Sequence, residues 1–83
     1  MPQFMDVHSG FNAVTGDQLH HAHQEDLKLQ DTEGVRFLHA WADPASGKVF
    51  CLSEGPSKEA VLRVHERAGH ATSEIYEVPI SVE

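Results

Sequence analysis

Strand-like and helix-like patterns alternate along this chain of 83 residues, and their order leaves few folds open to it. Short runs rich in branched and aromatic residues predict strands, whereas apolar residues at spacings of three and four predict helices. The patterns predict strands at residues 3–8, 35–43, 48–54 and 73–82, the last broken at Pro79, and helices beginning after Thr15 and after Ser57. The order strand, helix, strand, strand, helix, strand is that of the split βαβ arrangement. We therefore predict an α+β, ferredoxin-like βαββαβ fold, in which an antiparallel sheet carries both helices on one face.

Local signals define the ends of both helices. Thr15 and Gln18 have the spacing of a capping box, in which each side chain accepts a hydrogen bond from a free backbone N–H of the first turn. Ser57 is suited to cap the second helix in the same way. Gly34 and Gly69 follow the two apolar stripes, and glycine commonly ends a helix.

The length of the chain allows one domain, residues 1–83, with a modest core. So small a domain buries only about 60 to 65% of its unfolded surface, and association is a natural source of further stability. The helices leave one sheet face open, and apolar residues such as Phe37 or Trp41 on that face would be covered most simply by a second copy of the chain. We expect a homodimer formed through the open sheet face.

The charge balance disfavours two classes of partner. Thirteen acidic residues against six Lys and Arg give a formal net charge of −7, so nucleic acid and anionic membranes are poor partners. No stretch approaches the roughly 20 apolar residues needed to cross a bilayer. The first residues, MPQFMDVH, have neither the basic nor the apolar region of a secretory signal. We expect a cytoplasmic location.

Seven histidines are unusual in so short a chain, and three of them lie in the stretch LHHAHQED at residues 19–26. At about 100° per residue, His20 and His23 lie roughly 60° apart and can share a metal ion, whereas His21 points about 160° away from His23. Asp17 and Asp26 stand three residues outside this pair and can complete the shell or orient the imidazoles. A solvated face of mixed charge explains the same spacing, so both interpretations stay open.

Three further residues are candidate ligands because the fold can bring them together. His23 lies between Leu19 and Leu27 on the stripe that faces the sheet, and His65 has a similar position on the second helix. His8 ends the first strand, near a loop, where binding groups often lie. The alternative is that these histidines lie at the edge of the core and bond carboxylates or carbonyls.

The single cysteine, Cys51, excludes an intramolecular disulfide and lies in the middle of a predicted strand. It is either a small buried apolar residue or, beside a metal, a thiolate ligand. Imidazole with thiolate suits nickel, copper, zinc or iron better than magnesium or calcium. The chain lacks a glycine-rich phosphate loop and the GxSxG and HExxH motifs. General acid–base chemistry by His and Asp or Glu stays the alternative function, with a purely structural interaction domain as a third.

The chain also resembles a family of small ferredoxin-like domains that includes a bacterial nickel-binding protein. The resemblance rests on MDVH at 5–8, His23 with Asp26 and Leu27, GVRFLHAW at 34–41, GKVFCLSEGPSKEAV at 47–61, VHERA at 64–68 and EIYEV at 74–78. It implies a homodimer and binding of nickel or a similar divalent ion. The resemblance implies that His8, His23, Cys51 and His65 are ligands or polar groups that the family maintains, and that His20, His21 and His39 are particular to this chain. His70 stands one residue later than the corresponding histidine of the relatives.

These observations lead to one hypothesis for the function. We predict a protein that binds nickel, with zinc or copper as alternatives, and sequesters or senses the ion without catalysis. The predicted ligands are His8, His20, His23, Cys51 and His65. Metal bound at exposed histidines can also bridge dimers and cause higher assembly.

Overall fold

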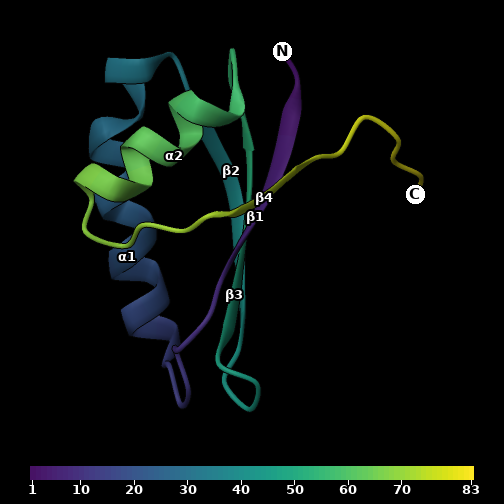
Figure 1. Ribbon diagram of the computed structural model, residues 1–83. Helices are drawn as coiled ribbons and strands as arrows, with labels where there is room; N and C mark the ends of the chain where they lie inside the picture. Colours follow the sequence, from purple (N-terminus) through teal and green to yellow (C-terminus); the bar gives the residue numbers. More distant parts are fainter.

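Four antiparallel strands form one sheet in the order β2-β3-β1-β4. The computed structural model describes residues 1–83. Its elements are β1 (Gln3–His8), α1 (Gly16–Leu29), the short 3-10 helix η1 (Gln30–Glu33), β2 (Arg36–Asp43), β3 (Lys48–Glu54), α2 (Lys58–Arg67) and β4 (Glu74–Glu77). Both helices lie on the same side of the sheet, and the other side is open (Figure 1). This confirms the predicted α+β, ferredoxin-like fold. Neither helix is long and apolar enough to cross a membrane.

The helices begin where the sequence predicts. The Thr15 hydroxyl accepts a hydrogen bond from the Gln18 N–H at 3.1 Å, and the Gln18 side chain accepts one from the Thr15 N–H at 2.9 Å, which completes the capping box. Ser57 Oγ accepts from the Ala60 N–H at 3.2 Å and caps α2. Gly34 follows η1 with a φ of 68°, a left-handed conformation that glycine adopts without strain. Local side chains therefore determine both helix starts.

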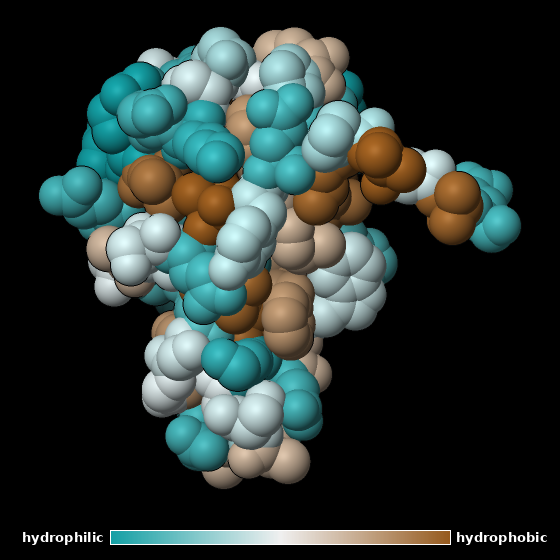
Figure 2. Space-filling view, turned by 45° about the vertical axis from the view of Figure 1, so that its right-hand side comes forward, coloured by the Kyte–Doolittle hydropathy of each residue, from teal (hydrophilic) through white to brown (hydrophobic).

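The last strand is shorter than predicted. β4 covers only Glu74–Glu77 of the predicted 73–82. The Val78 N–H still donates to the Gln3 carbonyl at 3.0 Å, but Pro79 has no N–H to continue the ladder. The chain then leaves the sheet as a tail, and Ile80 and Val82 in it are exposed (Figures 1 and 2).

A β-bulge decides which side chains of β2 face the helices. Phe37 pairs with Ser53, but His39 already pairs with Leu52, so β2 contains one extra residue between the two pairs. Phe37 therefore faces the helices, and the prediction that places it on the open face is wrong. Trp41 lies beyond the bulge, pairs with Phe50 and is 43% exposed on the open face.

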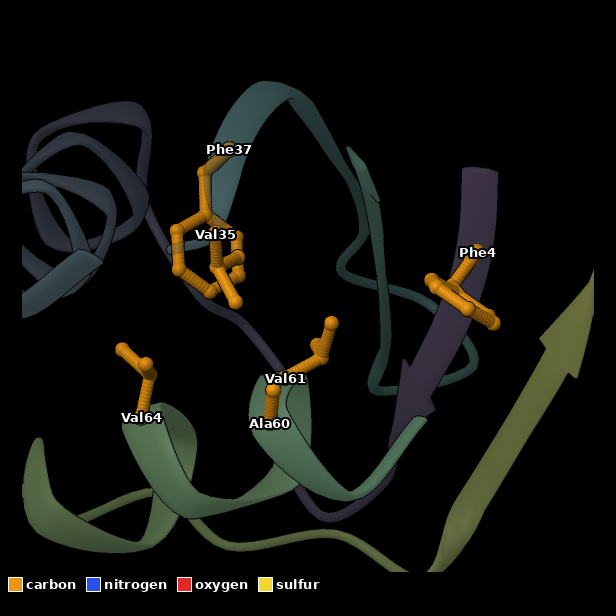
Figure 3. Packing of buried hydrophobic residues seen from close by; sticks show 6 residues of the cluster. All are labelled: Phe4, Val35, Phe37, Ala60, Val61 and Val64. Carbon is orange, nitrogen blue, oxygen red and sulfur yellow. The ribbon is translucent and has the colours of Figure 1, made fainter. Parts of the chain in front are cut away.

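The core fills one part of the space between the helices and the sheet. It is a cluster of buried apolar side chains from β1, from α2 and from the chain at and just before the start of β2, and we call it the apolar core. Its members are Phe4, Val35, Phe37, Ala60, Val61 and Val64. Figure 3 shows Val61 and Val64 of α2 pointing toward the side chains at the start of β2. Beside this core, near the end of β1, the side chains that face the helices are polar.

Candidate metal centre

Five polar side chains form a chain of hydrogen bonds beside the apolar core. His8 Nε2 donates to Asp6 Oδ1 at 2.8 Å, and His65 Nε2 donates to Asp6 Oδ2 at 2.9 Å. His65 Nδ1 donates to Asp26 Oδ1 at 3.0 Å, and His70 Nε2 donates to the same oxygen at 2.8 Å. We call these residues the His–Asp network. Histidine and carboxylate alternate in it, so every bond joins a ring N–H to an acceptor.

Three elements hold the His–Asp network in place. Asp6 and His8 are two residues apart on β1, so their side chains share the face that is covered by the helices. Asp26 comes from α1 and His65 from α2. His70 follows α2, where its N–H donates to the His65 carbonyl at 3.0 Å and brings the ring back toward the helix. All but His70 are buried, and the His70 side chain is 15% exposed.

Burial and mutual charge set the protonation states. Burial raises the pKa of Asp6 and of Asp26, but their hydrogen bonds and charge interactions with histidines outweigh it, so both lie below their ordinary values. Burial lowers the pKa of His65, but the bonds to Asp26 and Asp6 outweigh this and raise it to about 9. At neutral pH His65 is an imidazolium between two carboxylates, which is why both of its nitrogens can donate.

Cys51 completes the group from the neighbouring strand. It pairs with Asp6 in the register of β1 and β3, and its side chain is buried on the helix-covered face. Burial raises the pKa of the Cys51 thiol strongly, and the carboxylates of Asp6 and Asp26 raise it further. Without a cation the sulfur is therefore a protonated, unreactive thiol.

Two overlapping sets of these side chains are able to hold a metal ion. Asp6, His8, Cys51 and His65 offer donor atoms that all lie within 4.8 Å of one another, and Asp26, His65 and His70 form a second such set. Metal bonds of about 2.0 to 2.3 Å put tetrahedral ligands about 3.3 to 3.8 Å apart. Since no two donors of the larger set lie more than 4.8 Å apart, it needs a contraction of at most about 1 to 1.5 Å around an ion. Its nitrogen, oxygen and sulfur donors fit a borderline transition metal.

The five predicted ligands divide into two places. His8, Cys51 and His65 are brought together in the larger set, Asp6, His8, Cys51 and His65, which we call the inner cluster. His20 and His23 instead border a shallow surface hollow together with His39. His23 lies between the two places, because it also borders a cavity next to His8. Burial lowers the pKa of His23, and the charge of Asp26 opposes this shift.

Sequence reasoning missed Asp6 and the role of His70. Asp6 has a readable signal, since it alternates with Phe4 and His8 on the strand face that must be buried, and a buried carboxylate needs a partner. Asp26 was predicted only as a partner of the α1 histidines, whereas it bonds His65 and His70. His70 has no local signal, because the turn after α2 determines where its ring lies.

Comparisons with known proteins show the family of this chain. A sequence profile for the family described as "Nickel responsive protein SCO4226-like" matches residues 4–78. The chain belongs to this family. The crystal structure of SCO4226 from Streptomyces coelicolor A3(2) is 64% identical to it in sequence and covers 96% of this chain and 99% of that chain, with a TM-score of 0.94. No curated protein matches the chain. The family resemblance predicted from the sequence is therefore confirmed. The description of the family links it by name to nickel.

Proposed function

We propose that this protein binds a divalent transition-metal ion, nickel first and zinc or copper as alternatives, and sequesters or senses it without turning over a substrate. The observation that carries the proposal is the inner cluster of Asp6, His8, Cys51 and His65, with four buried donor groups within 4.8 Å. Membership of a family named for nickel responsiveness supports nickel as the first metal to test.

The chemistry of these donors explains how binding would be controlled. An ion at the inner cluster would displace the proton of the Cys51 thiol and one proton of His65, and its charge would replace them beside Asp6 and Asp26. Protons and metal therefore compete for the same atoms. We expect nickel affinity to weaken as the pH falls, and an affinity that does not change between pH 5 and pH 8 would speak against histidine ligands.

Calorimetric titration of metal-free protein with nickel, zinc and copper tests the proposal. Cys51→Ser keeps the size of the buried side chain but replaces the sulfur ligand. His21→Ala is the matched control, because His21 is a histidine whose side chain is 78% exposed and lies outside both donor sets. We expect micromolar or tighter nickel binding, at least about tenfold weaker in Cys51→Ser, and unchanged in His21→Ala.

The other outcomes of this titration are equally informative. The double variant His20→Ala with His23→Ala removes the outer pair of predicted ligands. If this variant alone loses nickel, the outer pair holds the ion and the inner cluster is a structural network. If no metal binds better than about millimolar, the protein is not a metal-binding protein.

We further propose that residues 1–83 are one domain and that two copies pair through the open sheet face. Trp41 and Tyr76 are exposed on that face at 43% and 54%, and Met5, Phe50 and Leu52 lie between them, half-buried. A second copy would cover this apolar surface. Sedimentation of the protein and of Trp41→Glu tests this, with dimer and monomer as the expected results. A monomer for the unchanged protein would contradict the pairing.

Location and higher assembly complete the proposal. A single free, buried cysteine suits a reducing compartment, which supports a cytoplasmic location. The exposed histidines of α1, His20 and His21, offer ligands through which nickel would bridge dimers. Light scattering should rise during nickel titration, and a flat signal would contradict the bridging.

A further inference from the structure

A cavity of about 330 Å³ lies beside the His–Asp network, between α1, the loop that follows β1, and the helix-covered face of β2 and β3. This volume is within the range of small-molecule sites and far exceeds what one ion fills. Most of its wall is apolar. The apolar wall is formed by Phe11, Val14, Leu19, Ala22, Ala40 and Val49.

The loop that closes the cavity is held in a defined position. The Phe11 N–H donates to the Gly47 carbonyl at 2.9 Å, and the Ala13 N–H donates to the Pro44 carbonyl at 3.0 Å. The turn between β2 and β3 therefore anchors the loop, and hydrogen bonds within the chain hold this wall of the cavity in place. A preformed apolar cavity with a few polar groups at one end is typical of a binding site for organic molecules.

The polar end of the cavity offers hydrogen-bond acceptors. His8 and His70 both border it, and each uses Nε2 to donate to a carboxylate. Nδ1 of each ring has no hydrogen-bond partner within the chain, and it is an acceptor in the tautomer whose proton is on Nε2. Ser53 Oγ is the one fully buried polar side-chain atom without a partner. Nδ1 of the buried His8 therefore reaches open space, and the space that His8 borders is the cavity.

Charge and hydrogen bonding select the class of ligand. Asp26 borders the polar end and Asp6 lies behind it, so two carboxylates stand there, and His65 is bonded to both. An anionic ligand would be repelled, whereas a neutral group with an O–H is able to donate to Nδ1. We propose that the cavity binds a small, neutral, mainly apolar molecule with a hydroxyl group, which donates to Nδ1 of His8.

Titration of the metal-free, ¹⁵N-labelled protein with 4-ethylphenol, monitored by NMR, tests this inference. Its methyl ether lacks the donor, and 4-ethylbenzoate replaces it with an anion. We expect 4-ethylphenol to bind with a dissociation constant below about 1 mM, to shift the backbone resonances of the cavity wall, and to shift the ¹⁵N resonance of His8 Nδ1. The ether and the benzoate should bind at least about tenfold more weakly, because each leaves the acceptor unpaired.

Two variants locate the site without altering the His–Asp network. Ala22→Phe puts a large side chain into the cavity and should abolish binding of 4-ethylphenol, whereas Ala45→Phe makes the same change in an exposed turn and should not. Equal binding of the phenol and its ether, or unchanged binding to Ala22→Phe, would overturn the inference. Nickel titration of Ala22→Phe separates it from the proposed function, since the inner cluster keeps all its donors in this variant.

Discussion

The space between the helices and the sheet is filled in two different ways. The apolar core contains six buried side chains without a single ionisable group. The His–Asp network begins one or two residues further along β1 and α2, and it contains two carboxylates and three histidines. Phe37 joins the two regions, since its ring centroid lies 5.0 Å from that of His65. Burial stabilises the first region at any pH, whereas the second is stable only in particular states of protonation or ligation. The fold thus places its apolar packing and its buried ionisable groups in two neighbouring regions.

Phe4→Ala should have the largest effect on stability among the changes considered. Phe4 is 2% exposed in the apolar core, and removing a buried phenylalanine side chain typically costs about 3 to 5 kcal/mol. We expect the free energy of unfolding in urea to fall by about this amount equally at pH 5.5 and at pH 8. A loss that differs between the two pH values would show that the two regions are not energetically separate.

The His–Asp network should make the stability depend on pH in a defined direction. The pKa of His65 is raised to about 9 from an ordinary value of 6.5, so its contribution is complete below pH 6.5 and is lost as the pH rises through about 9. The pKa values of Asp6 and Asp26 are lowered, so their contribution is present above their ordinary value of 3.8 and is lost as the pH falls below it. Stability should be greatest between pH 3.8 and pH 6.5, where both contributions are complete.

Urea unfolding of metal-free protein, from below the ordinary pKa of aspartate to above the raised pKa of His65, measures the decrease in stability on the acid side and on the alkaline side. The decrease in the free energy of unfolding on the alkaline side should amount to roughly 3 kcal/mol, since each pKa unit corresponds to about 1.4 kcal/mol. His65→Gln should be less stable, and its stability should not fall on the alkaline side. If this variant keeps the decrease above pH 6.5, a group other than His65 causes it.

The two regions also differ in how far the sequence reveals them. Helix starts follow from local pairs such as Thr15 with Gln18, which act within one turn. The orientation of Phe37 was not predictable, because the bulge that turns it inward depends on how β2 pairs with β3. Within the site, His8 and His65 were found by residue type and position. Their common partner Asp6 was missed, because a carboxylate in a strand is usually assigned to the solvent face.

Gly47→Ala tests the frame of the cavity and should have a smaller effect. Gly47 has a φ of 75°, and an added Cβ would lie 2.7 Å from Asn12 Oδ1 and 3.0 Å from the Asn12 backbone nitrogen. We expect a loss of about 1 to 2 kcal/mol from the left-handed conformation, together with displacement of the loop. Gly10→Ala is the control, because Gly10 has a φ of 88° but no atom within 4 Å of the added Cβ. Gly10→Ala should lose stability without changing the resonances of Asn12, and equal spectra for both variants would contradict the contact.

Ser53→Ala should have the smallest effect, although Ser53 is fully buried. Its side chain lies on the helix-covered face beside Phe4 and Phe37 in the sheet register, and its Oγ has no hydrogen-bond partner. A buried hydroxyl without a partner has already lost its water, so its removal should leave the stability unchanged or raise it by up to about 1 kcal/mol. Ser57→Ala removes a hydroxyl that caps α2 and should cost about 1 kcal/mol. If Ser53→Ala costs as much, the Ser53 hydroxyl has a partner such as bound water, and the polar region extends along β3 into the apolar core.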